Sequence, residues 1–115
     1  MNEDTFDIEQ FVKNKKAELV RENKLDKLEK IPLEDQIYII RGFNRREWVE
    51  FVSECAKKNI MPDSIEFENE TINTMVVYPE NLNVDAMSAG TTTTLFNYIM
   101  ELSGFSNEEI KPVLL

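Results

Sequence analysis

The chain has 115 residues, which is enough for one domain with a modest hydrophobic core. Its 22 acidic and 13 basic residues give a formal net charge of −9, which would repel the phosphates of a nucleic acid. The lack of histidine and the single cysteine, Cys55, exclude the usual zinc sites, histidine-activated nucleophiles and a disulfide within the chain. We therefore expect no enzyme, no metal or other cofactor, and no nucleic-acid partner.

The N-terminal residues 1–7 are acidic and lack the basic start and apolar run of a secretory signal. No window of the sequence approaches the roughly 20 apolar residues that are needed to cross a bilayer. These features predict a soluble protein without a membrane partner.

Residues 4–22 have the pattern of an amphipathic helix, with acidic side chains early and basic side chains late, as the helix dipole favours. Two interpretations stay open. The helix packs on the core, or it belongs to an arm that docks on a partner, because a short helix needs such contacts to persist. We divide the chain into this arm, residues 1–24, and a core domain, residues 25–115.

Residues 36–41 (QIYIIR) are rich in β-branched and aromatic side chains and are the best candidate for a strand. A lone strand is unstable, and residues 27–31 can pair with it across a turn at residues 32–35. Pro32 prevents a helix from continuing through this region. The sequence therefore predicts one short strand or β-hairpin near residues 27–41.

A helix of about residues 44–58 is predicted next. Asn44, with Glu47 three residues later, has the spacing of a capping box. Trp48 and Cys55 both lie on the apolar stripe of this helix. We interpret Trp48 as a core anchor and Cys55 as a small buried side chain that no histidine can activate.

The segment after the next linker is ambiguous. Asp63 and Glu66 repeat the capping-box spacing, which favours a helix that reaches Tyr78. The β-branched residues of 71–78 (TINTMVVY) also fit a strand. Helix is the preferred interpretation here, because both the cap and the helical spacing of the apolar residues support it.

Residues 88–105 (SAGTTTTLFNYIMELSGF) combine a start signal, a helical body and a stop signal. Ser88 or Thr91 can accept hydrogen bonds from the first turn. Gly104 supplies the left-handed residue that ends many helices, and Phe105 can fold back on the last turn as in a Schellman motif. This segment is the best-formed helix that the sequence predicts.

A last short helix is expected at residues 106–111, and the apolar residues 112–115 either close the core or wait for a partner. The predicted fold is mainly α, a small helical domain of four to five helices with the short strand or hairpin attached. The expected core comprises Ile37, Ile39, Trp48, Phe51, Val52, Cys55, Ile72, Met75, Val76, Leu95, Ile99, Leu102 and Phe105.

Arg41, Arg45 and Arg46 form a basic cluster at the junction between the predicted strand and helix. Their guanidinium groups can pair with nearby carboxylates, or they can dock an acidic or phosphate group of a partner. The many carboxylates mostly fall on predicted solvent faces, where nothing separates their pKa values for acid–base catalysis. We therefore predict no catalytic residue.

Three segments, taken in order, resemble a known group of proteins. They are RGFNRREW at residues 41–48, VVYPE at residues 76–80 and SAGTTTTLFNYIMELSGF at residues 88–105. They are similar to the strand-to-helix junction, the Tyr-Pro-Glu turn and the Ala-Gly helix of small tail and baseplate assembly proteins from bacteriophages with contractile tails.

The resemblance implies a non-enzymatic assembly protein, such as a chaperone, whose partners are other phage tail or baseplate proteins, and it is compatible with a homo-oligomer. Such a protein acts in the host cytoplasm during assembly, or it stays in the virion as a permanent structural component. The candidate protein-binding residues come from two sources. Six match the motifs: Arg41, Arg45, Arg46, Tyr78, Pro79 and Glu80. Four are apolar residues that the predicted core does not require: Phe6, Phe11, Val113 and Leu114.

A function of another class also stays open, that of an acidic inhibitor or nucleic-acid mimic acting on a host protein. The negative charge suits this role. The lysines that interrupt the acidic residues between positions 13 and 30 argue against it, because a mimic needs a continuous acidic face.

Overall fold

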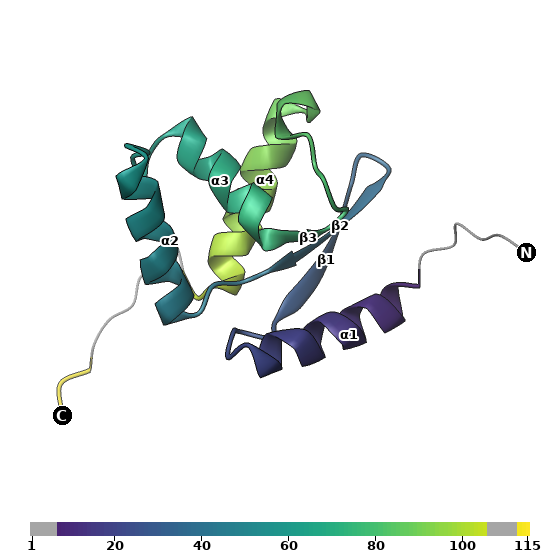
Figure 1. Ribbon diagram of the computed structural model, residues 1–115, viewed down its shortest axis with the longest axis horizontal. Coiled ribbons are helices and arrows are strands. Elements are labelled where there is room, and N and C mark those ends of the chain that lie inside the picture. The colour runs from purple at the N-terminus through teal and green to yellow at the C-terminus, as the bar shows by residue number, and fades with distance from the viewer. Residues whose placement is uncertain (1–6, 106–112) are drawn as a thin grey trace, which may run out of the picture.

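The computed structural model describes residues 7–105 and 113–115. The helix expected at residues 106–111 lies outside these described residues. Within them the chain forms the following elements in order (Figure 1): α1 (Ile8–Arg21), β1 (Leu28–Leu33), β2 (Gln36–Arg41), α2 (Arg45–Lys57), α3 (Ile65–Met75), β3 (Val76–Tyr78), the short 3₁₀ helix η1 (Val84–Ala86) and α4 (Ala89–Leu102).

The three strands correct the prediction of a mainly α fold. They form one antiparallel sheet in the order β1, β2, β3, so the described residues make a small α+β domain. The error lies in residues 76–78, which were predicted as the end of a helix and form a strand instead. α3 ends at Met75, and the β-branched residues that follow pair with β2 instead of continuing the helix.

β1 and β2 form the expected hairpin, with a tighter turn than expected. Glu34 and Asp35 both have positive φ, 48° and 63°, as a two-residue type I′ turn requires. Pro32 therefore lies inside β1, opposite Ile37, rather than in the turn. An edge strand accepts proline where the missing N–H would have faced away from the neighbouring strand.

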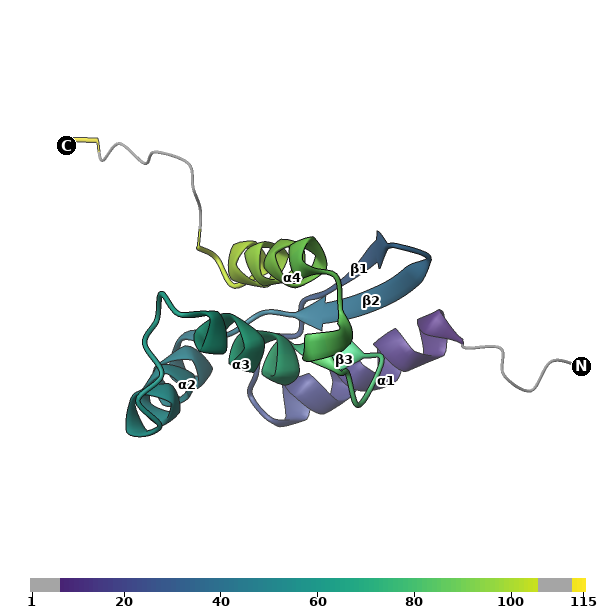
Figure 2. The ribbon, with the colours of Figure 1, turned by 90° about the horizontal axis from the view of Figure 1, so that it is seen from above.

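The sheet lies between two helices, with α4 on one face and α1 on the other (Figure 2). Side chains of β2 alternate between these faces. Tyr38 and Ile40 point into the main core with α3 and α4, while Ile39 is buried on the opposite face. Leu19 is the buried residue of α1, so this helix packs on the domain in the structure.

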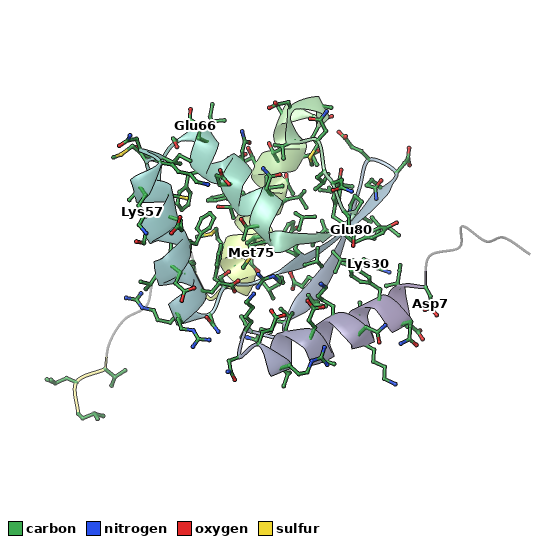
Figure 3. All side chains as sticks on the ribbon, viewed as in Figure 1. Asp7, Lys30, Lys57, Glu66, Met75 and Glu80 are labelled. Atoms are coloured by element: carbon green, nitrogen blue, oxygen red, sulfur yellow. The ribbon has the colours of Figure 1, made fainter. Side chains whose placement is uncertain are left out.

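The main core lies between β2, α3 and α4, and the fully buried Met75 is at its centre, whereas Lys57 and Glu66 point outward (Figure 3). Its buried members are Tyr38, Ile40, Phe43, Ile72, Met75, Leu95 and Ile99. The expected core did not include five residues that are buried in the structure: Leu19, Tyr38, Ile40, Phe43 and Phe67.

Six of the predicted core residues are buried as expected: Ile39, Cys55, Ile72, Met75, Leu95 and Ile99. Six more are half-buried: Ile37, Trp48, Phe51, Val52, Val76 and Leu102. Phe105 was wrongly placed in the core, because it is 45% exposed, although its ring packs against Trp48.

α4 ends as the sequence predicts. Gly104 has a φ of 96°, and its N–H donates to the Glu101 carbonyl at 3.0 Å. The Phe105 N–H donates to the Met100 carbonyl, also at 3.0 Å. These two bonds define a Schellman motif.

Two helix starts differ in detail from the prediction. Ser64, not Asp63, caps α3, because its hydroxyl accepts from the Phe67 N–H at 3.1 Å. Ser88 occupies the expected cap position of α4, but its hydroxyl donates to Glu34 at 2.9 Å instead of accepting from the helix.

No helix in the described part of the chain is long and apolar enough to cross a membrane.

Candidate functional site

The predicted basic cluster is divided by the fold. Arg41, at the end of β2, is buried, and its guanidinium donates two hydrogen bonds to the Glu47 carboxylate, at 2.8 and 2.5 Å. Asn44 holds Glu47 in the first turn of α2 by accepting from its N–H at 2.9 Å. Arg41 therefore forms an internal bidentate ion pair, while Arg45 and Arg46 are exposed.

The predicted Tyr-Pro-Glu site lies at the end of β3. Tyr78 is half-buried, and its ring meets the edge of the Phe11 ring with centroids 5.9 Å apart. Two predicted binding residues thus contact each other and join α1 to the sheet. Pro79, which follows a cis peptide bond, and the exposed Glu80 line a surface hollow of about 420 Å³.

The remaining candidates are the apolar residues near the two ends of the sequence. Phe6 lies outside the described residues. Val113 and Leu114 are 81% and 98% exposed. The structure therefore brings Phe11 and Tyr78 together, but it does not gather the described candidates into one surface.

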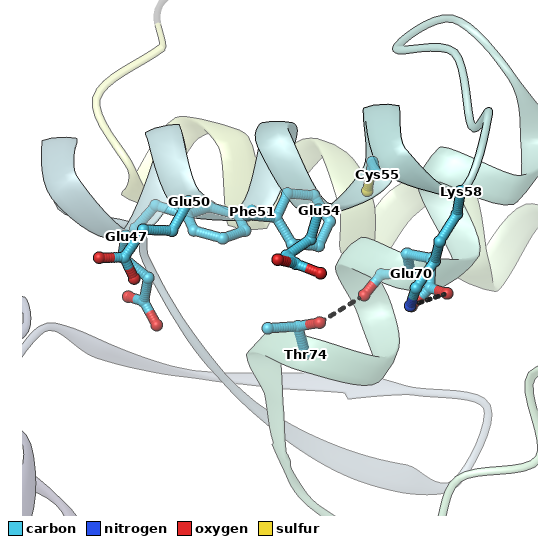
Figure 4. Close-up of a pocket in the computed structure, with 9 residues that line it drawn as sticks. Glu47, Glu50, Phe51, Glu54, Cys55, Lys58, Glu70 and Thr74 are labelled. Atoms are coloured by element: carbon cyan, nitrogen blue, oxygen red, sulfur yellow. Dashed lines mark hydrogen bonds and ion pairs between the residues drawn. The ribbon is translucent and has the colours of Figure 1, made fainter.

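A different surface has the features of a binding site. This surface, which we call the α2–α3 pocket, is a cavity of about 280 Å³ between the two helices (Figure 4). Its apolar floor and charged rim are formed by Phe43, Glu47, Glu50, Phe51, Glu54, Cys55, Lys58, Glu70 and Thr74.

The spacing of residues on α2 explains the rim. Glu47, Glu50 and Glu54 are three and four residues apart, so their carboxylates follow one side of the helix (Figure 4). Glu70 and Thr74 face them from α3. The spacing is visible in the sequence, but by itself it predicts only a solvent-facing side of a helix. The carboxylates become a rim only because α3 packs against α2.

The carboxylates of the rim differ in how they are paired. Glu47 is bound by Arg41, Glu54 has an exposed partner in Lys57 at 3.2 Å, and Glu70 lies 3.7 Å from Lys58. Exposed ion pairs of this kind are weak, worth about 0–1 kcal/mol, so a ligand can compete for them. Glu50 has no ion-pair partner among the described residues. The rim is therefore negative, and two carboxylates of α2 are open to a cationic ligand.

Cys55 lies in the floor of the pocket as a free, buried thiol. Burial raises its pKa, the nearby carboxylates of Glu70 and Glu54 raise it further, and only Lys58 acts in the opposite direction. The thiol is therefore protonated at neutral pH and is a poor nucleophile. Within the described residues there is also no group of three or more side chains arranged to hold a metal ion.

Comparisons with protein families, with curated proteins and with solved structures find no match for this chain. Function therefore has to be inferred from the α2–α3 pocket and from the resemblance of the three sequence segments.

Proposed function

We propose that this protein is a non-enzymatic binding protein that takes part in the assembly of a bacteriophage tail or baseplate. It holds another tail protein at the α2–α3 pocket. The observation that carries the binding role is this pocket, where an apolar floor with Phe51 is surrounded by the carboxylates of Glu50 and Glu54. The tail-assembly role depends on the sequence resemblance alone.

The size and lining of the pocket suit a protein ligand. Its volume of about 280 Å³ is near the lower end of the roughly 300–1,000 Å³ that is typical of small-molecule sites. An apolar side chain of a partner would bury surface against Phe51 and gain about 25 cal/mol for each Å² removed from water. The charged rim would select the partner and speed its approach.

A binding role is favoured over catalysis by the state of the thiol in the pocket. The Cys55 thiol is held protonated, and the rim carboxylates lie open to solvent or in ion pairs. Arg41 and Tyr78 were predicted to bind a partner, but both make contacts within the domain. We therefore propose the pocket, and not these two residues, as the partner surface.

Site-specific photocrosslinking tests this function. Glu54 is replaced by the photoreactive amino acid benzoylphenylalanine in cells that express the tail genes of the parent phage, and Glu29 of β1, also exposed, serves as the control position. We expect the variant at position 54, and not the variant at position 29, to form an adduct with a tail or baseplate protein identified by mass spectrometry.

Other adducts would overturn the proposal. Crosslinks from position 54 to host proteins alone would favour the acidic inhibitor. If neither position forms an adduct although both variants fold, the pocket is not the partner site.

Measurement of purified particles by mass spectrometry separates the two assembly roles, because a permanent component is present in the particles and a chaperone is absent.

A further inference from the structure

We infer that the α2–α3 pocket binds a cationic amphipathic helix, in which an apolar anchor is flanked by lysine or arginine residues one helical turn apart. This inference depends on the proposed binding function and gives the chemistry of the bound segment. It follows from the rigidity of the pocket floor, the spacing of its carboxylates and the charge of the whole chain.

The pocket floor is a fixed apolar surface. The Phe51 ring packs against Phe43 and Phe67, with centroids 5.0 and 5.3 Å apart. Phe43 and Phe67 are each only 2% exposed, so the core holds the floor in place from behind. A preformed apolar floor costs little conformational entropy on binding and suits the insertion of an aliphatic or aromatic anchor.

The open carboxylates set the spacing of the cations in the ligand. Glu50 and Glu54 are four residues apart on α2, which corresponds to a rise of about 6 Å. A helix lying along α2 presents side chains at i and i+4 with the same repeat. Two lysines or arginines at that spacing would each face one carboxylate, while Glu47 stays bound to Arg41.

The charge of the chain favours a partner protein over the other occupants of such a pocket. The carboxylates of the rim repel a nucleic acid. A second copy of this chain also carries a formal net charge of −9, so the two copies repel each other before they come into contact. The basic residues Lys13 and Lys16 of α1 are exposed, but Val20 is the only large apolar side chain exposed on that helix. A small free cation would leave the apolar floor unfilled.

Binding of synthetic peptides tests the inference. The probe is a fluorescein-labelled amphipathic helix of about 18 residues, or five turns, built from leucine and lysine. One control peptide has the same composition in a non-amphipathic order, and another has glutamate in place of lysine. Fluorescence anisotropy with the full chain should show binding of the amphipathic lysine peptide only, weakening as salt rises from about 50 to 200 mM.

Matched variants locate the binding site. Glu50→Gln with Glu54→Gln should weaken binding about tenfold, because two exposed charge pairs with the peptide are lost. Glu29→Gln with Glu66→Gln changes the net charge equally at exposed positions outside the pocket and should change affinity less than about twofold.

Several outcomes would contradict the inference. Equal weakening by both double variants, or equal binding of the reordered peptide, would show a general attraction between a basic peptide and an acidic protein. Self-association of the wild type that is lost in the Glu50/Glu54 variant would identify a second copy as the occupant. No peptide binding, together with a crosslink from position 54, would keep the proposed function and reject the cationic helix. Peptide binding without that crosslink would reject the tail-protein partner instead.

Discussion

Gly42 joins β2 to α2 and lies against the C-terminal end of α4. A Cβ atom at this position would meet the Leu102 carbonyl oxygen at 2.9 Å and its carbonyl carbon at 3.0 Å, which are backbone atoms that cannot rotate away. The next residue, Phe43, donates its N–H to the Ser103 hydroxyl at 2.8 Å, and this hydroxyl donates to the Ile99 carbonyl at 2.6 Å. These contacts fix the start of α2, and with it the pocket, on α4.

Gly42→Ala should therefore lower the free energy of unfolding by about 1–3 kcal/mol, the usual effect of inserting a methyl group into a tightly packed site. Gly90→Ala is the matched control, because a Cβ there meets nothing within 4 Å. It should raise stability by up to about 1 kcal/mol, since alanine favours the helix. Urea unfolding followed by the fluorescence of Trp48 measures both changes. A neutral Gly42→Ala variant would show that the end of α4 can move away.

α2 is attached to the rest of the domain by aromatic side chains. Trp48 meets Phe43, Phe67 and Phe105 with ring centroids 5.2, 6.0 and 4.8 Å apart. Edge-to-face and tilted pairs of this kind add about 0.5–1.5 kcal/mol each beyond the burial of their surface. Trp48 therefore connects α2 to α3 and to the residues that follow α4.

Trp48→Ala should lower the free energy of unfolding by about 3 kcal/mol, the lower end of the range for large core aromatics, because Trp48 is half-buried. Val49→Ala on the same helix should change it by less than about 0.5 kcal/mol, since Val49 is 49% exposed. Circular dichroism during urea unfolding compares the two variants without depending on tryptophan fluorescence. If both variants unfold like the wild type, Trp48 does not hold α2 in place.

The helix ends and the hairpin were predictable, because their sequence signals lie within a few neighbouring residues. The cap of α2 at Asn44, the Schellman motif at Gly104 and the pairing of β1 with β2 all depend on neighbouring residues. β3 was missed because a three-residue strand is stabilised by β2, which lies more than 30 residues earlier, and not by its own sequence. The α2–α3 pocket was missed for the same reason, since its rim exists only after two helices have packed.

At the scale of the whole molecule, charge and the sheet edge govern how the protein meets other molecules. In the described residues β1 pairs only with β2, so its other side is an open edge. Exposed Glu29, Lys30 and Pro32 lie along this strand. Charged residues and proline on an edge strand oppose pairing with another chain. Self-association through this edge of the sheet is therefore disfavoured.

The chain has no histidine, the side chain that normally titrates between about pH 6 and 8. Lys24 lowers the pKa of Glu22 through a hydrogen bond and its charge, so any stabilisation by Glu22 is lost only as the pH falls through the acidic pKa of the folded state. Burial raises the pKa of Cys55. Any contribution of this thiol to the free energy of unfolding is therefore present below its unfolded-state pKa and is lost as the pH rises above that pKa. Neither transition falls between about pH 6 and 8.

The free energy of unfolding should therefore vary by less than about 0.5 kcal/mol between pH 6 and 8. Urea unfolding at constant ionic strength across this range measures it. A slope near 1.4 kcal/mol per pH unit would contradict the expectation, because it would show that one carboxylate takes up a proton on folding near neutral pH.

The position of α4 in the core determines when this protein can fold during its synthesis. Tyr38, Ile40 and Met75 are translated before Leu95 and Ile99, the α4 side chains that cover them. Until α4 has left the ribosomal exit tunnel, the nascent chain therefore exposes the apolar face of its sheet. We therefore expect a nascent chain that lacks α4 to aggregate or to need a chaperone, and we expect the domain to fold only after α4 has been synthesised.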